Sequence, residues 1–150
     1  MSDNFVTLIP EDPKYVPTAD QQSAAGKHMR ELAPDAGEIT TETFDTVQFF
    51  DCGANFESAS CPRCKAQIPQ EWWEDQMEAD YSDGFLLAAY DTPCCGKGVN
   101  LNELVYNWPQ GFSRFAVSAM NPDIGKLSDL QREEFEAILG AKLKVIYSHL

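Results

Sequence analysis

The chain has 150 residues, of which 43% are hydrophobic and 11% aromatic, so it is long enough to form one domain with a sizeable core. Its 24 acidic and 11 basic side chains give a net charge of −13 at pH 7. This is the wrong sign for a nucleic-acid-binding protein, whose affinity comes largely from Lys and Arg that neutralise phosphates.

No stretch of the sequence approaches the roughly twenty apolar residues of a membrane span. The cysteines number five, which is odd, and no apolar run stands behind a basic N-terminus. Both observations argue against a secreted protein with a disulfide framework. We therefore expect a cytoplasmic protein in a reducing environment.

The first third of the chain predicts a strand, a helix and a second strand. Residues 5–9 form a short apolar run that is typical of a strand. Thr18 and Gln21 have the spacing of a capping box, and the helix that follows them must end before Pro34. Residues 38–51 are rich in β-branched and aromatic side chains, which favour an extended conformation.

Two short cysteine motifs follow, CPRC at residues 61–64 and CCG at residues 94–96. A CxxC pair lets two sulfur atoms face one ion, and zinc takes four such ligands in a tetrahedron. Residues 85–90 and 99–101 predict strands on either side of the second motif, which would then lie at the tip of a hairpin. The spacing predicts a structural zinc ion bound by Cys61, Cys64, Cys94 and Cys95.

Residues 56–106 resemble zinc ribbons, and the motif CPRCKAQI carries the resemblance. The second half departs from that family, whose second turn is usually another CxxC. Two adjacent cysteines bind one ion only where the backbone bends sharply between them, so Cys52 is an alternative source of the fourth ligand. Two other interpretations stay open, namely a catalytic CxxC redox pair and ordinary buried thiols.

A second resemblance involves the segment TPCCGKGVNLNELVYNWPQGFSRFAV, residues 92–117. It is similar to stretches of small bacterial proteins of unassigned function that pair a CPxC with a later CC. The similarity implies a bacterial origin and a set of cysteines linked by zinc. It implies no activity.

The segment between the two cysteine motifs is strongly acidic. It has seven acidic residues and no basic one between Lys65 and Lys97. Such a surface attracts a basic protein partner, although the acidity can also serve solubility alone. Trp72 and Trp73 begin a short amphipathic helix that runs to Tyr81. We expect one of the two to be partly exposed, as at binding hot spots, unless both cover the small core beside the cysteines.

The end of the chain predicts a strand, a helix and a final strand. Residues 112–120 alternate between apolar and polar side chains, as in a half-buried strand. Ser128 and Gln131 repeat the capping-box spacing, and Gly140 ends the helix. Residues 143–148 alternate again and predict the last strand.

Without the cysteine region, the order is strand, helix, strand, strand, helix, strand. This is the order of the ferredoxin-like βαββαβ unit, in which two helices cover one face of a four-stranded antiparallel sheet. We therefore expect an α+β fold with a single domain, residues 1–150. A zinc-ribbon-like insertion, residues 56–106, would lie between its second and third strands and would need a metal because about fifty residues bury little core.

The sequence contains no GxSxG, GxxxxGK[ST] or GxGxxG motif. We therefore expect a non-enzymatic, zinc-stabilised interaction protein whose acidic insertion docks onto a basic protein. One concrete form is an immunity or inhibitor protein that covers the active site of a cationic toxin. The alternative is a thiol- or zinc-dependent enzyme that uses the cysteines of the CxxC and CC motifs. Neither nucleic acid nor membrane is expected as a partner.

Overall fold

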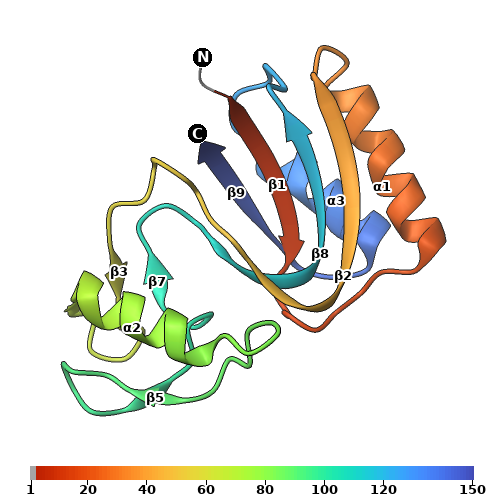
Figure 1. Ribbon diagram of the computed structural model, residues 1–150. Helices are drawn as coiled ribbons and strands as arrows, with labels where there is room; N and C mark the ends of the chain where they lie inside the picture. The colour runs from red at the N-terminus through yellow and green to blue at the C-terminus, as the bar shows by residue number, and fades with distance from the viewer. Residues whose placement is uncertain (1–2) are drawn as a thin grey trace.

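The computed structural model describes residues 3–150, and its largest element is a four-stranded antiparallel sheet (Figure 1). The order across the sheet is β2-β8-β1-β9, formed by strands β1 (Asn4–Pro10), β2 (Glu38–Phe50), β8 (Gly111–Met120) and β9 (Leu143–His149). Asn4 pairs with His149 in the register of β1 and β9, so the two ends of the described chain lie side by side. The predicted α+β class is confirmed.

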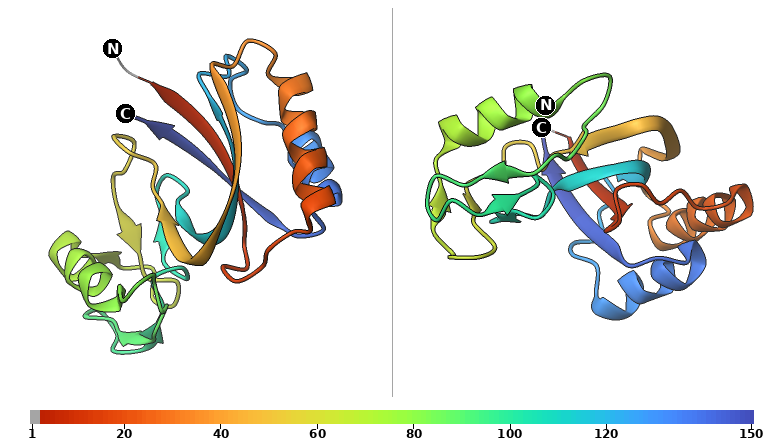
Figure 2. Two further views of the ribbon diagram at one scale, coloured as in Figure 1. Left: turned by 45° about the vertical axis from the view of Figure 1, so that its right-hand side comes forward. Right: turned by 90° about the horizontal axis from the view of Figure 1, so that it is seen from below.

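Helices α1 (Ala19–Leu32) and α3 (Asp129–Leu139) lie together on one face of this sheet (Figures 1 and 2). Both begin as the sequence predicts, because both capping boxes are complete. Helix α3 ends at Gly140, whose φ of 75° is left-handed and therefore favours glycine. Within residues 3–150, none of the helices has the length and apolarity that crossing a bilayer requires.

The main core lies between the sheet and these two helices. Its buried side chains are Leu8, Ala25, Met29, Phe115, Val117, Ala119, Phe135, Leu139 and Leu143. One part of the prediction for β8 is wrong, because Ala116 on the opposite face of this strand is also buried, against Ile9, Cys52 and Ile146. The chain that leaves β2 folds back over the sheet there, so this strand is covered on both sides.

The chain between β2 and β8, residues 51–110, forms a smaller unit at one end of the sheet, which we call the insertion (Figure 1). It contains α2 (Gln70–Asp80) and the short strands β3 (Ala59–Ser60), β4 (Gln67–Ile68), β5 (Tyr90–Asp91), β6 (Gly98–Val99) and β7 (Val105–Tyr106). These strands pair in the order β4-β3-β7 and as the hairpin β5-β6.

The insertion packs against the sheet through an apolar cluster that both regions share. Val47 of β2 and Phe112 of β8 belong to the same buried cluster as Ile68 and Val99 of the insertion. The ring of Phe112 lies 5.0 Å from the ring of Phe85, measured between centroids. The end of the sheet therefore supplies part of the core that the insertion lacks.

The strand predicted at residues 85–90 is wrong except for its last residue, since β5 spans only Tyr90–Asp91. The reason is Asp80, which is fully buried. Its carboxylate accepts hydrogen bonds from the backbone N–H groups of Leu87 and Ala88, at 2.7 and 2.9 Å, and from the hydroxyl of Tyr90 at 2.8 Å. These bonds use N–H groups that a strand would pair, and Leu87 takes a left-handed φ of 53°.

Candidate metal centre

Two turns of the insertion, residues 60–68 and 91–99, have the same backbone structure. In the first turn, the N–H of Cys61 donates to the carbonyl of Ala66, and the carbonyl of Cys61 accepts from the N–H of Lys65. In the second turn, Thr92 makes the same two hydrogen bonds, to Lys97 and from Gly96. Both turns then contain a left-handed residue, Lys65 at φ 69° and Gly96 at φ 71°. The turns are one structural repeat, and the second motif lies at a hairpin tip as predicted.

This repeat shows how the second motif departs from the first. The equivalent positions are Cys61 and Thr92, Arg63 and Cys94, and Cys64 and Cys95. Thr92 is 3% exposed, and its hydroxyl oxygen lies 3.4 Å from the sulfur of Cys95. The second turn is therefore a CxxC turn whose first cysteine is replaced by threonine, and Cys94 provides a sulfur from a different position.

The tertiary structure brings all four predicted ligands together. The sulfur atoms of Cys61, Cys64, Cys94 and Cys95 lie within 4.8 Å of one another, and those of Cys61 and Cys95 are 3.9 Å apart. In a tetrahedral site with metal–sulfur bonds of about 2.3 Å, neighbouring sulfurs are about 3.8 Å apart. Cys61 is buried, whereas the other three are exposed. The four cysteines can therefore hold a metal ion near the surface of the insertion.

The first turn sets the acidity of its two thiols in opposite directions. The backbone N–H groups of Cys64 and Arg63 point at the sulfur of Cys61, and they lower its pKa to about 6. The N–H of Ala66 lowers the pKa of Cys64 as well, but the surrounding sulfurs and partial desolvation of this exposed thiol outweigh it and raise this pKa to about 11. Ionisation of one thiol therefore opposes ionisation of the next, and a bound cation would remove that conflict.

Cys52, the alternative fourth ligand, lies outside the sulfur cluster. It is fully buried with Ile9, Ala116 and Ile146, on the face of the sheet away from the helices. Its thiol donates a hydrogen bond to the side-chain oxygen of Gln110 at 3.3 Å, and burial raises its pKa. The structure thus places Cys94, and not Cys52, beside the other three cysteines.

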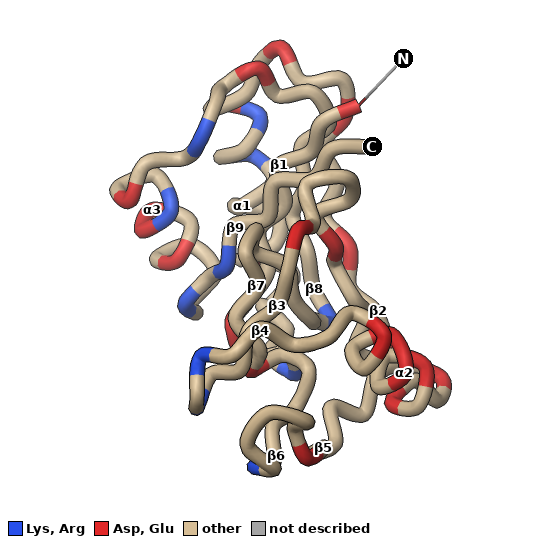
Figure 3. The backbone as a smooth tube through the Cα atoms, turned by 90° about the vertical axis from the view of Figure 1, so that its left-hand side faces the viewer, with Lys and Arg blue, Asp and Glu red and all other residues tan. Residues whose placement is uncertain are grey.

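Helix α2 has two different faces. Trp72, Trp73 and Met77 pack against the apolar cluster of the insertion, and the indole N–H of Trp73 donates to the hydroxyl of Tyr106 at 3.1 Å. Both tryptophans are half-buried, which agrees with the interpretation that they cover this small core. The other face carries the exposed carboxylates of Glu71, Glu74, Asp75 and Glu78, and Figure 3 shows acidic positions gathered along α2.

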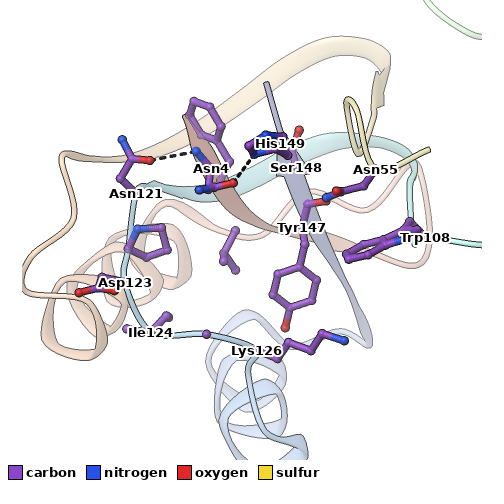
Figure 4. A pocket seen from close by; sticks show the side chains of 14 residues that line it. Asn4, Asn55, Trp108, Asn121, Asp123, Ile124, Lys126, Tyr147, Ser148 and His149 are labelled. Atoms are coloured by element: carbon purple, nitrogen blue, oxygen red, sulfur yellow. Dashed lines mark hydrogen bonds between the residues drawn. The ribbon is translucent and has the colours of Figure 1, made fainter. Parts of the chain in front are cut away.

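A pocket, which the sequence analysis did not predict, lies where β1, β9 and the loop after β8 meet (Figure 4). Its volume is about 640 Å³. His149 hydrogen-bonds through Nδ1 to the side-chain oxygen of Asn4 at 2.6 Å, and the hydroxyl of Tyr147 accepts from the N–H of Leu127 at 2.7 Å. The first bond joins the two ends of the described chain to each other, and the second joins β9 to the loop.

Comparison with known proteins gave no matching family model, no similar curated protein and no similar solved structure. The centre is therefore interpreted from its own geometry. Thr92 is the residue that the sequence analysis missed, although a signal for it exists: TPCCGKG aligns without gaps to CPRCKAQ, with threonine in the position of the first cysteine.

Proposed function

We propose that this protein is a non-enzymatic interaction module, stabilised by one zinc ion, whose acidic helix α2 binds a basic protein. The metal part rests on the four clustered sulfur atoms, because soft thiolates at tetrahedral spacing suit zinc among the common divalent ions. Cys61, Cys64, Cys94 and Cys95 would hold the ion. Zinc would then offset the repulsion between thiolates and fix the two turns to each other, without a chemical role.

We propose in addition that the sheet and its helices are a ferredoxin-like unit, with residues 56–106 as a zinc-ribbon-like insertion. The strand order β2-β8-β1-β9 supports this assignment, as does the position of α1 and α3 on one face. The cysteine turns on the hairpins β3-β4 and β5-β6 support the ribbon part. A fold by itself assigns no function, so the function must be argued from the surface.

The observation that carries the partner proposal is the exposed face of α2. Four pairs of its carboxylates are three or four residues apart, namely Glu71/Glu74, Glu71/Asp75, Glu74/Glu78 and Asp75/Glu78, and the helix contains no Lys or Arg. Like charges at these spacings destabilise a helix by about 0.2–0.5 kcal/mol per pair. Solubility does not require this arrangement, because charges interspersed over the whole surface serve it without a field of a single sign on one helix. A basic surface against this face would relieve the repulsion and be attracted over a distance.

Apolar side chains next to α2 add contact area for a protein partner. Tyr81 and Leu86, which follow the helix, are 52% and 65% exposed. A partner with a cationic groove, such as a nuclease toxin, would match the charge of this surface, and the protein would then act as its immunity or inhibitor protein. A reducing cytoplasm would suit the proposal, because the cysteines must stay reduced to bind zinc.

The test is a pull-down from the native host with the full-length protein, at low and at physiological salt. Wild type should retain basic proteins at low salt and lose part of them as salt screens the charges. A triple variant that removes three of the four carboxylates on this face of α2 should retain much less of them: Glu71→Gln, Glu74→Gln and Glu78→Gln.

A matched control removes three exposed carboxylates elsewhere: Glu31→Gln, Asp35→Asn and Glu133→Gln. This control changes the net charge by the same amount but leaves α2 intact, so it should retain what wild type retains. Equal loss in both variants would mean that total charge, and not this helix, decides binding. Capture of no basic protein by wild type at low salt would refute the proposal.

The exposure of three of the four sulfurs favours one alternative, a thiol- or zinc-dependent enzyme. A catalytic thiol reacts with alkylating agents in the native protein, whereas a thiolate bound in a structural site is protected until a chelator is added. Alkylation followed by peptide mass spectrometry, with and without chelator, separates the two functions. Rapid modification of the exposed Cys64 and Cys95 without chelator would favour the enzyme.

A further inference from the structure

The four sulfur atoms of the metal centre are not equivalent. Three of them, on Cys61, Cys64 and Cys95, occupy the first and last positions of the CxxC turn. The N–H of Arg63 donates to the sulfur of Cys61 at 3.4 Å. Cys64 and Cys95 are equivalent in the repeat, and the same backbone hydrogen bonds close both turns, so the backbone holds these two cysteines in the same way.

Cys94 occupies the position equivalent to Arg63, which is not a cysteine position of a CxxC turn. In the first turn that position faces outward, and the guanidinium of Arg63 reaches across to the carbonyl of Gly98 at 3.3 Å. The backbone of the second turn keeps the same hydrogen bonds as the first, so it has not bent to accommodate a cysteine at this position. Cys94 nevertheless places its sulfur in the cluster from this irregular position, and like Cys64 and Cys95 it is exposed.

The regular position of the fourth sulfur holds the hydroxyl of Thr92. This side chain is buried, and its oxygen contacts the sulfur of Cys95. A neutral alcohol is a poor ligand beside three thiolates, which prefer a soft fourth donor. If the sulfur of Cys94 dissociates from the ion, the ion keeps three protein ligands and gains an open coordination position, as in sites that exchange a ligand.

The charges around the centre indicate what can enter this position. The insertion has only three basic residues, Arg63, Lys65 and Lys97, and all three are exposed in the two turns. A cationic rim on an otherwise acidic unit favours an anionic ligand over a cationic one. A small anionic thiol combines this charge with the soft donor atom that the ion prefers.

We infer that Cys94 is an exchangeable ligand, and that the fourth position of the metal centre binds the thiolate of a small anionic thiol while Cys61, Cys64 and Cys95 retain the ion. In the exchange a metal–sulfur bond to the incoming thiol forms as the bond to Cys94 breaks. The proton of the incoming thiol passes to the Cys94 thiolate, and no electron is transferred. The inference rests on the metal site of the proposed function and not on its acidic helix.

The test uses the full-length protein loaded with Co²⁺, whose absorption bands report how many thiolates bind the ion. Cys94→Ser should keep one ion per chain but lose about a quarter of the thiolate-to-metal charge-transfer intensity, because three thiolates of four remain. Glutathione should restore that intensity, and cysteamine, a cationic thiol, should do so only at higher concentration. The matched variant Cys95→Ser removes a supported ligand, so its affinity for Co²⁺ should fall by about a hundredfold or more, one ligand's share in a four-ligand site.

The double variant Thr92→Cys/Cys94→Ser rebuilds a regular CxxC turn. It should bind Co²⁺ with four thiolates and be insensitive to glutathione. In zinc-loaded wild type, Cys94 should be the first of the four cysteines to be alkylated, as mapped by peptide mass spectrometry.

Equal loss of metal in Cys94→Ser and Cys95→Ser would overturn the inference. A Cys94→Ser protein whose charge-transfer intensity does not change when glutathione is added would also overturn it. Those results would leave zinc and the binding function of α2 intact. If wild type binds neither Co²⁺ nor Zn²⁺, the inference and the metal part of the proposed function fail together.

Discussion

The sheet with helices α1 and α3 and the insertion between β2 and β8 are held together by different means. The strands of the sheet are 7 to 13 residues long, and Leu8, Phe115 and Phe135 are fully buried between the sheet and the helices. Each strand of the insertion has 2 residues, and its cluster of buried side chains includes two that belong to the sheet, Val47 and Phe112. We therefore expect apolar burial to be enough for the first region, and the second to need links through sulfur and polar groups as well.

The polar links of the insertion form two separate groups, one around Tyr106 and one around Asp80. The hydroxyl of Tyr106 accepts from the indole of Trp73 and donates to the carbonyl of Leu101 at 2.7 Å, and burial raises the pKa of this tyrosine. Asp80 likewise fixes the irregular segment before β5. Each link joins segments that the short strands cannot hold, which makes the insertion sensitive to single changes.

Removal of the proposed zinc ion should distinguish the two regions most clearly. Zinc contributes about 10–16 kcal/mol to the folding of small structural sites. A chelator should therefore unfold the insertion while the sheet stays folded. Hydrogen exchange with mass spectrometry should show loss of protection in residues 59–106 and unchanged protection in β1, β8 and β9. Lower pH should act in the same direction, because the cysteine thiols must lose their protons to bind the ion.

Two results would break this comparison. Loss of protection in both regions together would mean that the sheet also depends on the metal through the shared apolar cluster. Unchanged protection in both would mean that apolar packing alone holds the insertion.

The converse change removes apolar burial from the sheet. Phe115→Ala should lower the free energy of unfolding by about 3–5 kcal/mol, because it leaves a cavity in the main core. The metal content of the folded protein should not change, since Phe115 lies outside the cluster of the insertion. Leu130→Ala on α3 is the control: this side chain is 73% exposed, and the change should stay within about 0.5 kcal/mol. Denaturant unfolding together with metal analysis would check both statements, and release of metal from Phe115→Ala would contradict them.

The two regions also differ in how much the sequence reveals. The strands and helices of the sheet follow from local signals such as capping boxes, Pro34 and the alternation in β8, because short-range geometry fixes them. In the insertion, cysteine spacing identifies the sulfur cluster, but the role of Asp80 depends on a backbone segment that folds back onto it. The burial of Ala116 likewise depends on the path of the chain after β2, and no periodicity encodes such contacts.

Asp80→Asn should weaken the insertion by about 1–3 kcal/mol, the cost of an unsatisfied buried hydrogen-bonding group. The carboxylate accepts three hydrogen bonds, and an amide would present N–H groups to some of these donors. The pKa of Tyr90, which burial and the Asp80 carboxylate raise to about 12, should fall toward its ordinary value of 10.0. Tyrosinate absorbance in a pH titration measures that shift, and chelator-induced unfolding measures the stability. Asp75→Asn, on the exposed face of α2, is the control that should change neither.

The smallest effects should come from the two helix caps and should fall on the sheet alone. Thr18→Ala and Ser128→Ala each remove a side chain that accepts the N–H three residues later, which should cost about 1 kcal/mol apiece. The two caps belong to different helices and share no hydrogen bond, so the double variant should show the sum. Thr18→Ser keeps the acceptor and should restore most of the loss. Because neither cap touches the insertion, the chelator concentration that unfolds it should stay the same. A shift in that concentration would show that the two regions are coupled through the sheet more tightly than their separate cores indicate.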